Sequence, residues 1–180
     1  EADGEVYLVF DFIDGKSLSA LLEELGRLPL EECRSILKQV CLAVDFAHKN
    51  KVLHRDLKPS NIMVGKDGFA RVLDFGLARA AKDSVSNLTR RQLSGTLAYL
   101  APEQHLGSSH RASDIYALGV TLYEMLTGEL PFQGPDLLSL KERGLYIPLS
   151  QKDTSLPRRL DALMSAALEP DHKKRLYRSI

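Results

Sequence analysis

Asp56, Lys58, Asn61 and Asp74 combine the side chains that phosphoryl transfer requires. They lie in two short runs, HRDLKPSN over 54–61 and DFG over 74–76. The Asp56 carboxylate can accept the proton of an attacking hydroxyl, and the Lys58 ammonium can neutralise the transferred group. The Asn61 amide oxygen and the Asp74 carboxylate are hard ligands of the kind that Mg²⁺ prefers. Each residue alone also fits an ordinary turn or cap, but the four together in this spacing favour the catalytic interpretation.

Apolar periodicity and turn residues predict the elements that position these side chains. We expect a strand over 5–12, helices over 17–25 and 29–50, short strands near 62–64 and 70–73, and helices from 113 or 114 to 127, over 136–143 and over 156–168. Residues 77–100 are polar and lack a period, which is typical of a long functional loop. The pattern predicts an α+β chain that is mostly helical.

The composition is that of an ordinary globular protein and excludes two classes of partner. Lys plus Arg and Asp plus Glu number 24 each among 180 residues, so no overall field favours nucleic acid or an anionic membrane. The most apolar stretch, 115–126, is too short to span a bilayer and contains Glu124. Cys33 and Cys41 fall in one predicted helix, roughly 12 Å apart along its axis, which is too far for a disulfide.

Together with Ala101-Pro102-Glu103, the two runs resemble the catalytic loop, metal-binding loop and activation-segment end of a protein kinase. The resemblance covers nearly the whole chain and implies a protein kinase-like α+β fold. Residues 1–12 would be the last strand of the smaller lobe and the hinge, 13–180 the helical larger lobe, and 74–103 the activation segment. Lys58 and Gly95-Thr96 resemble serine/threonine kinases, and the wording of 101–104 and 113–116 is similar to bacterial eukaryotic-like members.

The resemblance also implies residue roles. Asp56, Lys58, Asn61 and Asp74 would be catalytic, with Asn61 and Asp74 holding Mg²⁺, or Mn²⁺ in its place. Phe10 would be the gatekeeper, and Leu18 with Met63 would sandwich the adenine ring. The residues implied to contact ATP are Phe10, Asp11, Ile13, Ser17, Leu18, Lys58, Ser60, Asn61, Met63 and Asp74.

Three further features follow from the same resemblance. His54 and Phe75 would stack in an apolar column anchored by Asp114, and Glu103 would pair with Arg175. Arg55 before the catalytic aspartate is similar to kinases that are controlled by activation-loop phosphorylation, because a phosphate brings negative charge to pair with the arginine. The candidate acceptors, with Thr89 ranked first, are Ser84, Ser86, Thr89 and Ser94.

The chain contains no Gly-rich loop and no V-A-I-K lysine. The resemblance leads us to expect a Mg-ATP-dependent protein serine/threonine kinase. Because these two motifs are missing, we expect the 180 residues to transfer little or no phosphate by themselves. The expected partners are ATP and proteins with Ser/Thr acceptors, without nucleic acid, and with membrane contact only through segments outside this chain; the expected localisation is cytoplasmic. Two alternatives stay open: a noncatalytic kinase-like binding module, and a small-molecule phosphotransferase with the same fold.

Overall fold

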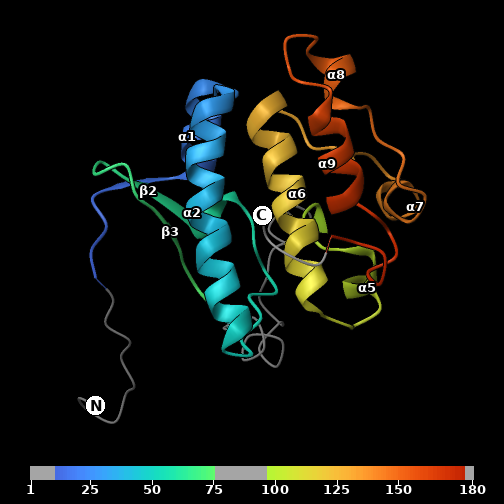
Figure 1. The fold of residues 1–180 in the computed structure, drawn as a ribbon, viewed down its shortest axis with the longest axis horizontal. Helices are drawn as coiled ribbons and strands as arrows, with labels where there is room; N and C mark the ends of the chain where they lie inside the picture. Colours follow the sequence, from blue (N-terminus) through green and yellow to red (C-terminus); the bar gives the residue numbers. More distant parts are fainter. Residues whose placement is uncertain (1–10, 76–96, 177–180) are drawn as a thin grey trace.

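The computed structural model describes residues 11–75 and 97–176, which form an α+β arrangement made mainly of helices (Figure 1). In chain order the elements are β1 (Gly15–Ser17), α1 (Leu18–Leu25), α2 (Leu30–Lys49), the 3₁₀ turn η1 (Pro59–Asn61), β2 (Ile62–Gly65), β3 (Ala70–Val72), α5 (Pro102–His105), α6 (Arg111–Thr127), α7 (Leu137–Glu142), α8 (Leu149–Lys152) and α9 (Arg159–Ala167).

The three strands form a small antiparallel sheet in the order β1-β2-β3. Ile62 at the start of β2 pairs with Val72 at the end of β3, and Ser17 of β1 pairs with Met63. Because neighbouring strands run in opposite directions, the residue that enters β2 and the residue that leaves β3 lie at the same end of the sheet. This register brings the 54–61 run next to the residues before Asp74.

Two long helices form the centre of the molecule. Helix α2 packs against α6 and against β3, and α6 packs in turn against α9, as Figure 1 shows. Gly119 lets α6 and α9 approach closely, because a Cβ atom there would lie 3.0 Å from the Cβ of Ala167 and 3.0 Å from Leu168 Cδ2. The main core collects buried aliphatic side chains from α1, α2 and α6, and it supports the loop that carries Asp56.

The structure confirms several predicted elements to within about two residues. The helices predicted over 17–25, 29–50 and 136–143 correspond to α1, α2 and α7, and the two short strands correspond to β2 and β3. Ser17 caps α1 by accepting a hydrogen bond from the Ala20 N–H, and Gly26 ends that helix with a φ of 76°. Cys33 and Cys41 are free and buried, as expected.

Two predicted helix starts were wrong. Helix α6 begins at Arg111, because Ser113 is not the cap: its hydroxyl accepts from the His110 N–H one turn before it. Helix α9 begins at Arg159 instead of at residue 156, since a residue directly before Pro157 is disfavoured in helical conformation.

Short elements were missed, and one prediction falls mostly outside the described residues. Sequence patterns did not reveal β1, η1, α5 or α8, each of which has only three or four residues. Of the strand predicted over 5–12, only Asp11 and Phe12 are described, and neither belongs to a strand. Residues 76–96, which contain most of the expected activation segment, also lie outside the described ranges.

Candidate active site

Asp56, Lys58 and Asn61 converge on one point of the loop before β2. The Lys58 Nζ lies 2.9 Å from Asp56 Oδ2, and the Asn61 Nδ2 donates to the Asp56 carbonyl over 2.7 Å and to its Oδ2 over 3.3 Å. The turn η1 brings Asn61 back toward Asp56, with the Asn61 N–H donating to the Lys58 carbonyl. Asp56 and Lys58 stay partly accessible, with side-chain exposures of 29% and 20%, so a substrate can reach them.

Backbone hydrogen bonds connect this loop to the run that contains Asp74. The Leu73 N–H donates to the Asn61 carbonyl over 2.8 Å, and the buried His54 donates from Nε2 to the Leu73 carbonyl over 2.7 Å. His54 Nδ1 accepts from the Asp56 N–H, which assigns the proton to Nε2. The His54 ring also lies against Phe75, with centroids 4.9 Å apart, as the resemblance implied. Asp74 is therefore held beside Asp56 and Asn61 through its preceding residue.

Asp114 anchors the backbone of the catalytic loop from α6. Its Oδ2 accepts from the His54 N–H (3.0 Å) and from His48 Nε2 (2.7 Å), and its Oδ1 accepts from the Arg55 N–H (2.8 Å). Arg55 adopts a φ of 73° and Asp74 a φ of 60°, in the left-handed region that costs roughly 1–3 kcal/mol for residues other than glycine. The hydrogen bond that Asp114 accepts from the Arg55 N–H helps to offset that cost at Arg55. Sequence analysis expected the Asp114 anchor but missed His48, whose position at the end of α2 gave no signal.

Asp114→Asn is expected to destabilise the fold by about 1–3 kcal/mol and to lower kcat. The amide places an N–H donor against donors that are already buried, so at least one hydrogen bond to the catalytic loop is lost. The urea midpoint measures the first effect, and the rate of the phosphotransfer predicted from the sequence measures the second. Asp136→Asn, at an exposed position before α7, is the matched control; equal midpoints for both variants would contradict the anchoring role.

The remaining residues predicted to contact nucleotide fall into two groups. Ser17 and Met63 pair across β1 and β2, and Leu18 is fully buried in the main core beside them. Asp11 and Ile13 lie before β1, where they line a cleft of about 640 Å³, and Ser60 is exposed on η1. Phe10 lies outside the described residues. The nucleotide contacts of these residues stay predictions.

Asn61 and Asp74 are the residues that could hold a divalent metal. Because Asn61 Nδ2 donates to Asp56, its Oδ1 is the amide atom left to bind a cation, and the Asp74 side chain is exposed. Over 11–75 and 97–176 no group of three or more His, Cys, Asp or Glu side chains gathers as a metal cluster. Two protein oxygens completed by phosphate oxygens and water suit Mg²⁺, which retains several non-protein ligands.

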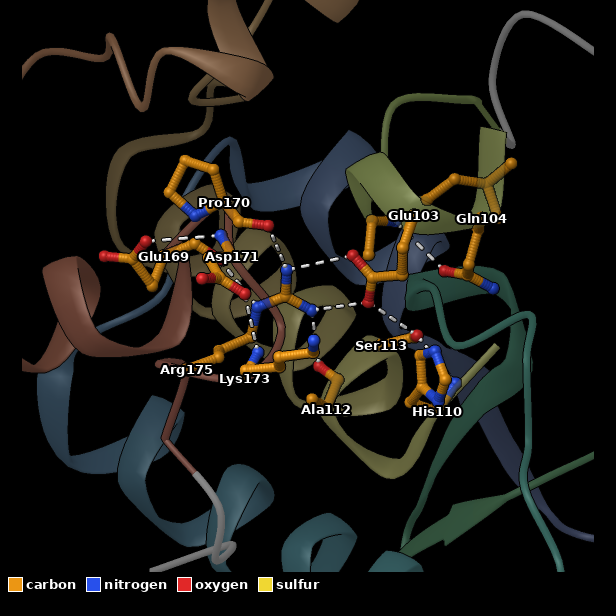
Figure 2. Close-up of polar contacts among 12 residues, drawn as sticks. Glu103, Gln104, His110, Ala112, Ser113, Glu169, Pro170, Asp171, Lys173 and Arg175 are labelled. Atoms are coloured by element: carbon orange, nitrogen blue, oxygen red, sulfur yellow. Dashed lines mark hydrogen bonds and ion pairs between the residues drawn. The ribbon is translucent and has the colours of Figure 1, made fainter. Parts of the chain in front are cut away.

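Glu103 on α5 and Arg175, in the segment after α9, form a buried ion pair (Figure 2). Arg175 Nη1 lies 2.7 Å from Glu103 Oε1 and Nη2 lies 3.0 Å from Oε2, a two-bond geometry, and the Ser113 hydroxyl donates to Oε1. Burial by itself would raise the pKa of Glu103, but the hydrogen bonds from Arg175 and Ser113 outweigh it and hold that pKa below its ordinary value. The predicted pair is confirmed.

Gln104 links this region to the catalytic loop, and sequence analysis missed it. Its Oε1 accepts from the Ala101 N–H and its Nε2 donates to the Arg55 carbonyl, both over 3.0 Å. Only its place directly after Ala101-Pro102-Glu103 could have marked it.

Within the described part of the chain, no helix is both long and apolar enough to cross a membrane.

Comparison with known proteins identifies similar chains. The family model for the protein kinase domain matches residues 1–178. The serine/threonine-protein kinase PknB of Mycobacterium leprae is 39% identical over 173 residues, which cover 94% of this chain and 28% of that protein. A probable serine/threonine-protein kinase PknB of Bifidobacterium longum is 34% identical over 180 residues, covering 97% and 26%. A probable serine/threonine-protein kinase of Clostridium perfringens is 36% identical over 169 residues, covering 92% and 24%. The chain thus spans about a quarter of the length of these curated relatives.

Proposed function

This chain belongs to the protein kinase family, and on that premise we propose that it acts in transferring the γ-phosphate of Mg-ATP to Ser and Thr hydroxyls of proteins. Residues 13–180 would form the larger lobe and 74–103 the activation segment. The convergence of Asp56, Lys58 and Asn61 on one point supports this proposal most strongly. The serine/threonine specificity rests on the names of the relatives and on Lys58.

Each side chain has a definite task in this mechanism. Bound Mg-ATP supplies the phosphoryl group and the metal charge. Asp56 accepts a hydrogen bond from the acceptor hydroxyl, orients its oxygen for in-line attack on the γ-phosphorus and takes its proton, while the bond from that phosphorus to the oxygen of the departing ADP breaks. Lys58, held 2.9 Å from Asp56, places a positive charge where negative charge develops. Asn61 and Asp74 would hold Mg²⁺ through their side-chain oxygens, and the metal would neutralise charge on the phosphates.

The surroundings of Arg55 support regulation by phosphorylation of the activation segment. Among the described residues, the buried Nε of Arg55 has no hydrogen-bond partner. A phosphate on Thr89, Ser84, Ser86 or Ser94 would supply acceptor oxygens for such a guanidinium. We also propose that this kinase domain lies in the cytoplasm, where ATP is available, whether or not other segments of the protein are anchored to a membrane.

Assay of the polypeptide encoded by the whole reading frame tests the proposal. With γ-labelled ATP, Mg²⁺ and an unstructured protein rich in Ser and Thr, label is expected on phosphoserine or phosphothreonine. Binding of ATP without transfer would favour the noncatalytic module, and label only on a metabolite would favour the small-molecule phosphotransferase. The same assay on the 180-residue chain alone tests the expectation of little or no transfer.

Asp74→Asn is expected to raise the Mg²⁺ concentration needed for half-maximal transfer by roughly tenfold or more, since losing even an outer partner of a metal site costs 10- to 100-fold. The exposed carboxylate carries the only negative charge proposed to bind the metal on the protein side. Titration of the rate with Mg²⁺ at saturating ATP measures the shift. Asp136→Asn, at an exposed position before α7, is the control, and an unchanged Mg²⁺ requirement for Asp74→Asn would remove this residue from the metal site.

A further inference from the structure

Lys141 on α7 is fully buried, which is unusual for a lysine. Its Nζ donates two hydrogen bonds of 2.7 Å, to the carbonyl of Leu97 and to the carbonyl of Leu100. It also lies 5.7 Å from the centre of the Tyr116 ring, within range of a cation–π contact. The side chain therefore crosses from α7 to the stretch that leads into Ala101-Pro102-Glu103.

In these apolar surroundings, burying a lysine costs more free energy than burying an apolar side chain of the same volume. The neighbouring core cluster contains Ala101, Tyr116, Val120, Phe132 and Leu168. Over 11–75 and 97–176, no carboxylate forms an ion pair with Lys141, and burial lowers its pKa to about 7. An apolar side chain would fill the same volume without desolvating an amine. What the amine adds is the connection to the two carbonyls.

The stretch that Lys141 holds has two further contacts, one with α6 and one with the catalytic loop. The Tyr99 hydroxyl donates to Glu124 Oε2 over 2.6 Å, which connects the stretch to α6. Gln104 joins the Ala101 N–H to the carbonyl of Arg55, the residue before Asp56. Helix α7, helix α6 and the catalytic loop thus fix residues 97–101 from three sides.

We propose that Lys141 is a positioning residue for protein substrates, because its amine sets where residues 97–100 lie relative to Asp56. The inference rests on the proposed function, in which this stretch belongs to the segment that docks a protein. Lys141 touches neither substrate nor nucleotide in this role. Its loss should weaken the binding of protein substrate and leave ATP binding unchanged.

The protonation state of Lys141 provides a second way to test the same contact. Its folded pKa is depressed, so its charge is lost as pH rises through about 7, and two charge-assisted hydrogen bonds become weaker neutral ones. The charged or titratable groups around it are His105 on α5, Glu142 on α7 and Tyr116 on α6. Arg175 also lies against the Tyr116 ring. Burial lowers the pKa of His105 and raises that of Tyr116, so burial favours the neutral form of both groups.

Steady-state kinetics of the full polypeptide test the proposal with Lys141→Met, which nearly keeps the volume of the side chain but removes the amine that donates both hydrogen bonds. We expect the KM for a peptide substrate to rise by about tenfold, while the KM for ATP changes by less than about twofold. Lys141→Gln, which keeps a neutral donor, should lie between. Lys38→Met, at an exposed position of α2, is the control.

The outcomes separate this inference from the proposed function. Equal peptide KM values for wild type and Lys141→Met, with equal melting temperatures, would overturn the positioning role while leaving the kinase proposal intact. A wild-type protein that phosphorylates no protein would overturn both. If the variants fail to fold, the pH dependence of the wild-type kinetics tests the role. A peptide KM that rises between pH 6 and 8 while the KM for ATP stays constant supports it. A ratio of the two KM values that stays constant over this range refutes it.

Discussion

Asp56→Asn is expected to lower kcat by roughly 10²- to 10⁴-fold, the usual contribution of a positioned general base. The change is nearly isosteric, and the shortest hydrogen bond that holds residue 56, from Asn61 Nδ2, goes to its backbone carbonyl. The loop geometry should therefore survive. What is lost is the carboxylate that orients the hydroxyl and pairs with Lys58 at 2.9 Å.

Three measurements make this expectation specific. Single-turnover rates of the full polypeptide report the chemical step, the KM for ATP reports whether the nucleotide still binds, and the melting temperature reports whether the fold is kept. The single-turnover rate should fall, the KM for ATP should change by less than about threefold, and the melting temperature should stay the same. Asp136→Asn provides an exposed aspartate changed in the same way. A loss of less than tenfold for Asp56→Asn would mean that another group activates the hydroxyl.

The residues of the candidate site could be found from the sequence because their chemistry is concentrated in short runs. Asp56, Lys58 and Asn61 are separated by two or three positions, so one loop and one 3₁₀ turn bring them together. Asp74 could be added because β2 and β3 form a hairpin, which returns the chain to the point where it left. Local spacing thus determined most of the site.

Contacts made by distant residues could not be found in the same way. His48 meets Asp114 across 66 positions and Gln104 meets Arg55 across 49, and nothing in either residue's neighbours indicates a partner. Lys141 lies in the helix predicted over 136–143, and nothing in the sequence indicated its burial, since a lysine is normally exposed. Arg175 was found only through resemblance to the kinase family. These contacts depend on helix packing, which residue types alone do not specify.

Arg175→Met is expected to reduce the free energy of unfolding by about 3–5 kcal/mol, because it leaves the Glu103 carboxylate buried without its partner. The Arg175 side chain is completely buried, and its remaining hydrogen bonds go to the carbonyls of Glu169, Ala112 and Pro170 (Figure 2). Ser113 still donates to Glu103 in the variant, but a hydroxyl cannot neutralise a carboxylate. Against a typical total of about 5–15 kcal/mol, such a loss is a large fraction of the stability. Urea unfolding measures it, with Arg159→Met at an exposed position of α9 as the control.

A double variant and a pH series show whether the cost comes from the unpaired charge. Glu103→Met with Arg175→Met should recover much of the loss, since a buried ion pair can often be replaced by apolar side chains at little cost. Because the folded pKa of Glu103 is depressed, the unfolded chain binds its proton more readily, and the pair's contribution is present above the unfolded pKa and lost as pH falls through the folded one. Wild type should therefore lose its advantage over Arg175→Met as the solution is acidified below about pH 4. A constant difference at every pH would mean that the three carbonyl contacts of Arg175, and not the charge of Glu103, account for the loss.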